Sequence, residues 1–163
     1  MLWIAATALV LGLVLVVIWF TRSKTAARWR AARLLAEFAR HRPQLEADFL
    51  QTVSKLGKPR GLDWQHIEWQ GPVFLAWDRP AGQYVALIEI AVQFAAREGG
   101  EMEGVDAVAL AKSGTARFVW SGRHWLPVGR VLFNLAPEDV LRQFTVQLAA
   151  LGVGADVNQV RQL

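Results

Sequence analysis

One short stretch of the chain places an acid, a base and an aromatic ring at the spacing of a shared strand face. Trp64, His66 and Glu68 alternate along a segment with strand texture, and alternate residues of a strand point to one face. As a site, His66 and Glu68 would form an acid/base pair beside an aromatic wall, which makes these three residues a candidate ligand cradle. The alternative is the solvent face of an edge strand.

Other chemistry is sparse. The three histidines, His41, His66 and His124, are far apart and show no metal-ligand spacing. An acidic loop could attract a divalent cation, although its spacing fits no EF-hand, and its members are Glu98, Glu101, Glu103 and Asp106. The absence of cysteine excludes disulfides, zinc–thiolate sites and thiol nucleophiles. We therefore predict a non-enzyme with no catalytic residue, no cofactor and no metal.

Tryptophan is the unusual residue of the second half of the chain. The five in this region are Trp64, Trp69, Trp77, Trp120 and Trp125. They could fill a core, or they could line a concave sheet as a binding cradle, since aromatic side chains dominate binding hot spots. Trp64 and Trp69 are five residues apart, an odd spacing, so we expect them on opposite faces of a regular strand.

The first residues of the chain form an uncharged apolar run from Leu2 to Phe20 that is bounded by Trp3 and Trp19. A helix of this length reaches about 28 Å, close to the bilayer's hydrocarbon thickness of about 30 Å. Aromatic residues at both ends match interfacial belts. The run predicts a single transmembrane helix; the alternatives are a cleaved signal peptide, which its poor cleavage context disfavours, and a buried core helix.

A basic stretch follows the run directly, and its members are Arg22, Lys24, Arg28, Arg30 and Arg33. Positive flanks stay on the cytoplasmic side, so the N-terminus is predicted outside and the C-terminal domain in the cytoplasm. These charges would also attract anionic lipid head groups. Residues 22–60 carry a net charge of +7 and residues 61–163 a net of −3, so the high pI reflects the membrane-proximal part rather than nucleic-acid binding.

The predicted organisation has four parts: an anchor at 1–21, a basic helical stalk and packing helix at 22–60, an α+β domain at 61–152 and a tail at 153–163. Helical periodicity indicates helices over 23–41 and 43–56, with Pro43 as the first residue of the second. The first helix is interpreted as a stalk, with an amphipathic lipid- or partner-contacting helix as the alternative.

Strands are predicted over 62–70, 73–77, 84–96, 105–110, 115–120 and 124–134. The pair 105–110 and 115–120 could instead be one long strand with a bulge at Gly114, and the last strand could be two pieces. Turns at Asp78–Gly82 and Ser121–Arg123 predict two hairpins. A last helix begins at Pro137 and presents an apolar face as far as Leu151. The result is an antiparallel sheet of four to six strands with helices packed on one face.

A long helix followed by an antiparallel sheet resembles the element order of cystatin-like and NTF2-like folds. Type IV pilins and pseudopilins also lead from an apolar helix into an α+β head, but this chain lacks their leader and the acidic residue early in the helix. The segments 57–62 (GKPRGL) and 129–137 (GRVLFNLAP) resemble an uncharacterised family of small bacterial membrane-anchored proteins, which implies no activity.

Three functions are consistent with these features. The first is a membrane-anchored, non-enzymatic interaction domain whose partners are the lipid bilayer, its anionic head groups and a protein yet to be identified. The second is a component of an envelope, secretion or pilus-like assembly with its head outside. The third is a head that binds a small ligand or carries an enzyme site.

Overall fold

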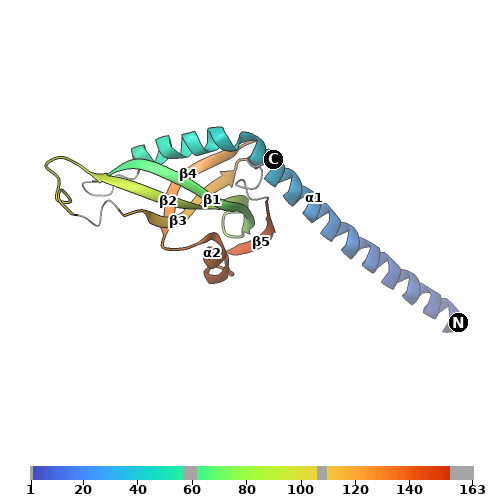
Figure 1. Ribbon diagram of the computed structural model, residues 1–163. Coiled ribbons are helices and arrows are strands. Elements are labelled where there is room, and N and C mark those ends of the chain that lie inside the picture. The colour runs from blue at the N-terminus through green and yellow to red at the C-terminus, as the bar shows by residue number, and fades with distance from the viewer. Residues whose placement is uncertain (1, 57–61, 106–109, 155–163) are drawn as a thin grey trace.

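The computed structural model describes residues 2–56, 62–105 and 110–154, with side chains described for residues 25–55, 62–105 and 110–154. These residues form an α+β fold in which a long and a short helix accompany a five-stranded antiparallel sheet (Figure 1). The predicted fold class and the predicted antiparallel sheet are therefore confirmed. The elements are α1 (Leu2–Leu56), β1 (Leu62–Asp78), β2 (Gln83–Ala96), β3 (Lys112–Trp120), β4 (Trp125–Phe133), α2 (Pro137–Gln143) and β5 (Leu148–Val153).

Helix α1 continues through Pro43, so the expected division into two helices is wrong. One apolar stripe crosses the proline, and its buried members are Ala31, Leu34, Phe38, Leu45, Phe49 and Val53. Pro43 is exposed, and its missing N–H costs a helix about 3 kcal/mol. Burial of each large apolar side chain contributes about 1.5–3 kcal/mol, so the stripe more than offsets the proline.

The sheet has the order β4-β3-β2-β1-β5. Both predicted hairpins are confirmed, since Asp78 pairs with Gln83 across the first turn and Trp120 with Trp125 across the second. The predicted strands over 124–134 form the single strand β4. The strand predicted at 105–110 falls mostly outside the described residues.

The strands predicted over 62–70 and 73–77 are one strand, β1. The register with β2 shifts between Gln70 and Phe74, where Gly71 adopts a φ of 63°. Glycine enters this left-handed region without a Cβ penalty, so the glycine and the proline that follows it form a bulge rather than a turn. The bulge bends β1 without ending it.

The C-terminal part departs further from expectation. Helix α2 begins at Pro137 with two acidic residues in its first turn, as predicted, but it ends at Gln143. Residues expected to extend it form β5 instead, where Leu148 pairs with Asp78 and Val153 with Phe74. The prediction of a long helix is wrong because pairing with β1 satisfies the backbone hydrogen bonds of these residues. The sheet thus extends to Val153, the first residue of the predicted tail.

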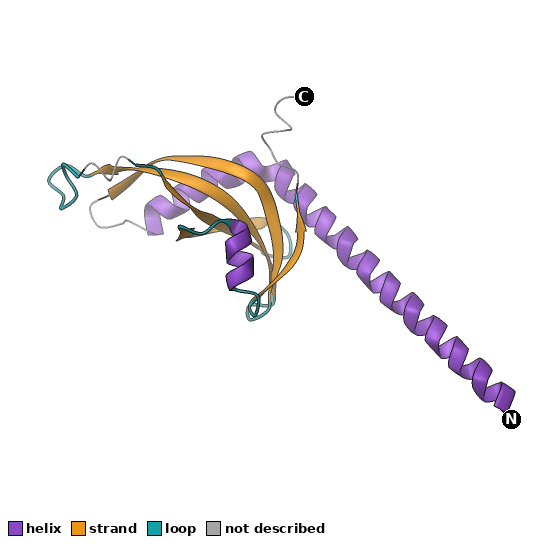
Figure 2. Cartoon of the chain, turned by 60° about the horizontal axis from the view of Figure 1, so that its bottom comes forward, coloured by secondary structure: helices purple, strands orange, loops and turns teal. Residues whose placement is uncertain are grey.

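The two helices cover opposite faces of the sheet, which corrects the prediction that both lie on one face (Figure 2). Along β2 the side chains alternate: Ala86 and Ile88 pack in the core beneath α1, whereas Leu87 packs with Val140 of α2 and with Phe74. Both sets are almost fully buried. Strand β2 is therefore buried on both sides, which its mixed odd positions only half indicated.

Among the residues whose side chains the structure describes, no helix is long and apolar enough to cross a membrane. The side chains of the run Leu2–Phe20, where the anchor is predicted, lie outside that part of the chain. The same holds for the predicted membrane residues Leu2, Trp3, Trp19 and Phe20. Their role stays a prediction.

Two strand glycines make a matched test of packing between β3 and β4. A Cβ at Gly114 would lie 2.8 Å from Val131 Cγ1 and 2.9 Å from the Leu132 oxygen, so Gly114→Ala should destabilise the domain by about 1–3 kcal/mol. A Cβ at Gly152 would meet only Leu35 Cδ1, at 3.7 Å. Gly152→Ala should therefore be neutral or stabilise by up to about 1 kcal/mol.

Urea unfolding of the two variants measures both effects. Equal losses of stability in the two variants would contradict the packing of β3 against β4.

Candidate functional site

The candidate cradle of Trp64, His66 and Glu68 is divided between the two faces of the sheet. Trp64 pairs with Phe94, whereas His66 pairs with Gln93, its neighbour on the opposite face of β2. The register shift between Trp64 and His66 leaves Gln65 as an extra residue, and such a bulge reverses the alternation. The expectation of a shared face is therefore wrong. His66 and Glu68 are exposed, while the Trp64 ring lies 4.9 Å from the Phe94 ring.

The same bulge places Trp64 and Trp69 on one face, contrary to the expected opposite faces. Trp69 pairs with Ile90 and its ring centroid lies 5.4 Å from that of Phe49 in α1. Trp125 is buried in the α1-side core, and Trp64, Trp69 and Trp120 pack against that core. For these four tryptophans the structure supports core filling over a binding cradle.

The predicted basic residues behave differently from the cradle. The side chains of Arg22 and Lys24 lie outside the described part of the chain. Arg28, Arg30 and Arg33 are exposed on α1. Two of these three meet a third arginine from a distant segment at a cavity of about 480 Å³.

We call this cavity the arginine cleft. It lies between α1 and the β3–β4 turn and is lined by Arg30, Arg33, Leu34, Glu37, Tyr84, Trp120, Gly122 and Arg123. Three arginines and one glutamate give its lining a net charge of +2. Arg123 was not predicted, since it belongs to a surface turn and reaches α1 only through the tertiary packing.

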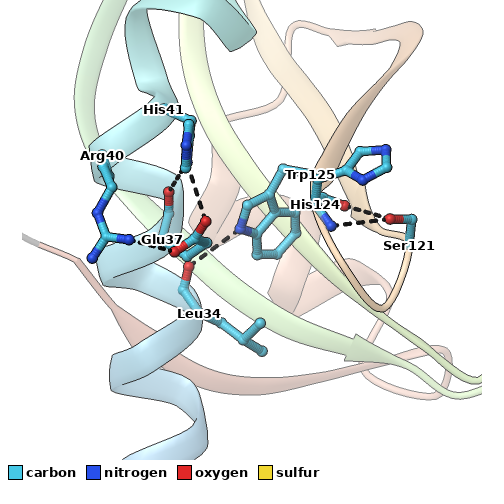
Figure 3. Close-up of polar contacts among 7 residues, drawn as sticks. All are labelled: Leu34, Glu37, Arg40, His41, Ser121, His124 and Trp125. Carbon is cyan, nitrogen blue, oxygen red and sulfur yellow. Dashed lines mark hydrogen bonds and ion pairs between the residues drawn. The ribbon is translucent and has the colours of Figure 1, made fainter.

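One hydrogen bond joins the strand after the turn to the helix, and two more shape the turn itself (Figure 3). The buried Trp125 indole donates from Nε1 to the backbone oxygen of Leu34 at 3.2 Å, which joins β4 to α1. Within the turn, Ser121 Oγ donates to the His124 oxygen at 2.8 Å and accepts from the His124 amide at 3.1 Å. The residues between them, including Arg123, are thus carried on a turn with defined geometry.

The charged groups at the cleft are unevenly paired. Arg30 Nη1 donates to the Tyr84 hydroxyl at 3.3 Å, and this hydrogen bond, with the charge interaction between the two groups, raises the pKa of Arg30. The single acid, Glu37, accepts from Arg40 at 3.1 Å and lies 3.2 Å from His41 Nδ1 (Figure 3). Glu37 is thus already engaged on its own helix.

Within the described residues, the guanidinium groups of Arg33 and Arg123 make no hydrogen bond or ion pair. Like charges brought together without counter-charges repel each other. The cleft is therefore an electropositive hollow that an anion would stabilise.

The opposite face of the sheet carries a different feature. Asp78 is buried and accepts from Arg117 Nη2 and from the amide of Ala81, so it holds both β3 and the β1–β2 turn. Two mostly apolar cavities of about 320 and 330 Å³ share Arg117 and Leu132 in their lining. The ion pair between Asp78 and Arg117 therefore has a structural role, and few other polar groups line these two cavities.

The acidic loop does not assemble a metal site among the described residues, where no group of three His, Asp or Glu side chains is placed to hold an ion. Glu103 instead accepts from the Gly99 amide at 2.7 Å and closes the turn. Asp106, the fourth member of the loop, lies outside the described residues.

The arginine cleft is thus the one place where predicted functional residues meet an unpredicted partner in the described structure. The likeness of the chain to a bacterial membrane-anchored family stays a prediction. Comparison of the chain with models of known protein families, with curated proteins and with solved structures found no match.

Proposed function

We propose that this chain is a single-pass membrane protein that presents a non-enzymatic α+β interaction domain at the cytoplasmic face. The observation that carries the proposal is the continuity of α1, from Leu2 to Leu56. One end of this helix bears the apolar run and the other bears the core of the head. In Figure 1 the helix projects far beyond the sheet, with the N-terminus at its distant end.

The charge distribution supports the orientation. The basic side chains from Arg22 to Arg33 follow the apolar run with no acid among them. Basic residues close to a span are retained on the cytoplasmic side, where anionic lipids attract them. Residues 61–163 carry a net charge of −3, which disfavours nucleic acid as a partner and is compatible with a protein partner.

Protease accessibility in right-side-out membrane vesicles tests the proposal. The head should be protected until the membrane is opened, whereas a domain outside would be digested at once. Immediate digestion would favour the second candidate, an envelope or secretion assembly component with its head outside.

Charge reversal tests the orientation separately. Replacing Arg22, Lys24, Arg28 and Arg30 by glutamate should invert the topology or mix it, because the positive flank is lost. The matched control reverses four exposed charges far from the run: Lys55, Lys112, Arg130 and Arg142. Unchanged protection of the head in the first variant would count against the orientation; the control should keep the original topology.

A further inference from the structure

We propose that the arginine cleft binds the phosphate group of an anionic ligand. The proposal concerns the site formed by Arg30, Arg33 and Arg123. The phosphate could belong to a lipid head group or to a soluble molecule, and the chemistry of recognition is the same for both.

The arrangement of charge carries the inference first. Arg30 and Arg33 come from α1 and Arg123 from the β3–β4 turn, so tertiary packing alone brings them together. A guanidinium presents its N–H groups as a planar fork that matches phosphate oxygens two at a time. The net charge of +2 at the lining balances the two negative charges of a phosphate dianion.

The walls of the cleft help to position the charges. Tyr84 and Trp120 are partly buried and form one side of the cleft, whereas the three arginines are exposed. The Tyr84 hydroxyl also holds Arg30 in place. A volume of about 480 Å³ lies within the range of small-ligand sites and suits a phosphate together with the group that bears it.

The site is preorganised. The hydrogen bond from Trp125 to Leu34 and the Ser121 turn fix the backbone of Arg123 relative to α1 before any ligand arrives. Binding then requires little ordering of backbone, which reduces its entropic cost.

The lipid source rests on the proposed membrane anchor, whereas the soluble source does not. Arg30 is ten residues beyond Phe20, about 15 Å along a helix. Helical side chains lean toward the N-terminus, which in the proposed topology is toward the membrane. The interfacial region adds about 5–7 Å to each side of the hydrocarbon core, so a tilted α1 would bring head-group phosphates within reach of the cleft.

The experiment uses the full chain in micelles of dodecyl maltoside, an uncharged detergent without phosphate, titrated with inorganic phosphate by calorimetry at low ionic strength. Wild type should bind saturably. Arg33→Gln combined with Arg123→Gln should weaken binding by about tenfold or more, because two charge-assisted contacts are lost. Arg28→Gln, which removes an exposed charge from the same helix outside the cleft, should change affinity by less than about twofold.

Mixed micelles separate the two sources. In micelles with about one part phosphatidylglycerol to two parts dodecyl maltoside, the head groups should compete with inorganic phosphate by direct occupancy if the ligand is a lipid, and they should weaken phosphate binding more than the same proportion of oleate, which supplies negative surface charge without a phosphate. Equal weakening by phosphatidylglycerol and oleate would assign the cleft to a soluble ligand.

Two results would overturn the proposal: no phosphate binding by wild type in dodecyl maltoside micelles, or equal weakening by the Arg28 variant and the double variant. Unfolding midpoints of the variants confirm that each is folded. A head found outside in the protease experiment would remove the cytoplasmic placement while leaving the phosphate titration unaffected, so the two failures are distinguishable.

Discussion

Two lysines in the middle of the apolar run should release the protein from the membrane. Val10→Lys and Leu13→Lys place charges near the centre of the proposed span, where each costs about 2.5–3.5 kcal/mol on insertion scales. Together they reduce the preference for the bilayer by several orders of magnitude. The measurement is the fraction that resists alkaline carbonate extraction, which should fall from nearly all of the protein to a small part.

The matched control adds the same two charges on the exposed surface of α1, by Ala32→Lys and Ala36→Lys. This variant should remain in the membrane. Continued resistance of the Val10/Leu13 double variant to extraction would argue that the run is not the anchor, and the proposed function would then lose its foundation.

Removing the Phe38 ring should cost the head about 3–5 kcal/mol, a large part of the 5–15 kcal/mol that stabilises a typical domain. Phe38 is fully buried and lies edge-on to two rings, Phe118 at 5.1 Å and Trp125 at 5.4 Å. Phe38→Ala therefore opens a cavity where α1 meets β3 and β4. Urea unfolding in mild detergent, followed by tryptophan fluorescence, measures the loss.

Trp29→Ala provides the control on the same helix. This side chain is 73% exposed, so its removal should change stability by less than about 0.5 kcal/mol. A small effect at Phe38 would mean that α1 contributes little to the core, and the head would then be a sheet with a loosely attached helix.

Element type could be predicted where local chemistry and tertiary packing agree. The β1–β2 hairpin follows from its turn residues, and Pro137 with two acids after it predicts the start of α2. Pro43 shows the limit, because its local signal for a helix start was overridden by the apolar stripe that crosses it. Similarly, Leu148 and Leu151 fit a helical face, but they lie in β5 because this segment pairs with the edge of β1.

The prediction of the candidate cradle is wrong because of a single extra residue in β1. Gln65 enters β1 without a partner on β2, and every side chain before it changes face relative to those after it. Gln65 is polar and exposed, like His66 beside it, so no composition signal marks the bulge. The alternation rule holds within each piece of the strand and fails across the join.

The arginine cleft was half predicted. Arg30 and Arg33 were identified by their place after the apolar run, whereas Arg123 stands in an ordinary turn that gives no indication of α1 nearby. A signal was present in Trp125, since a buried indole N–H requires an acceptor and its strand alone did not provide one. That acceptor is Leu34, one residue beyond Arg33.

An unbroken α1 ties the direction in which the head faces to the number of residues between the run and the core. Each residue inserted between Thr21 and Arg30 would turn the head by about 100° and lift it by about 1.5 Å. Seven residues would nearly restore its bearing, about 20° short of two full turns, while raising it by about 10 Å. Insertions shorter than two turns therefore change both the azimuth and the height of the arginine cleft relative to the proposed span, whereas an insertion of seven residues changes the height and leaves the azimuth nearly the same.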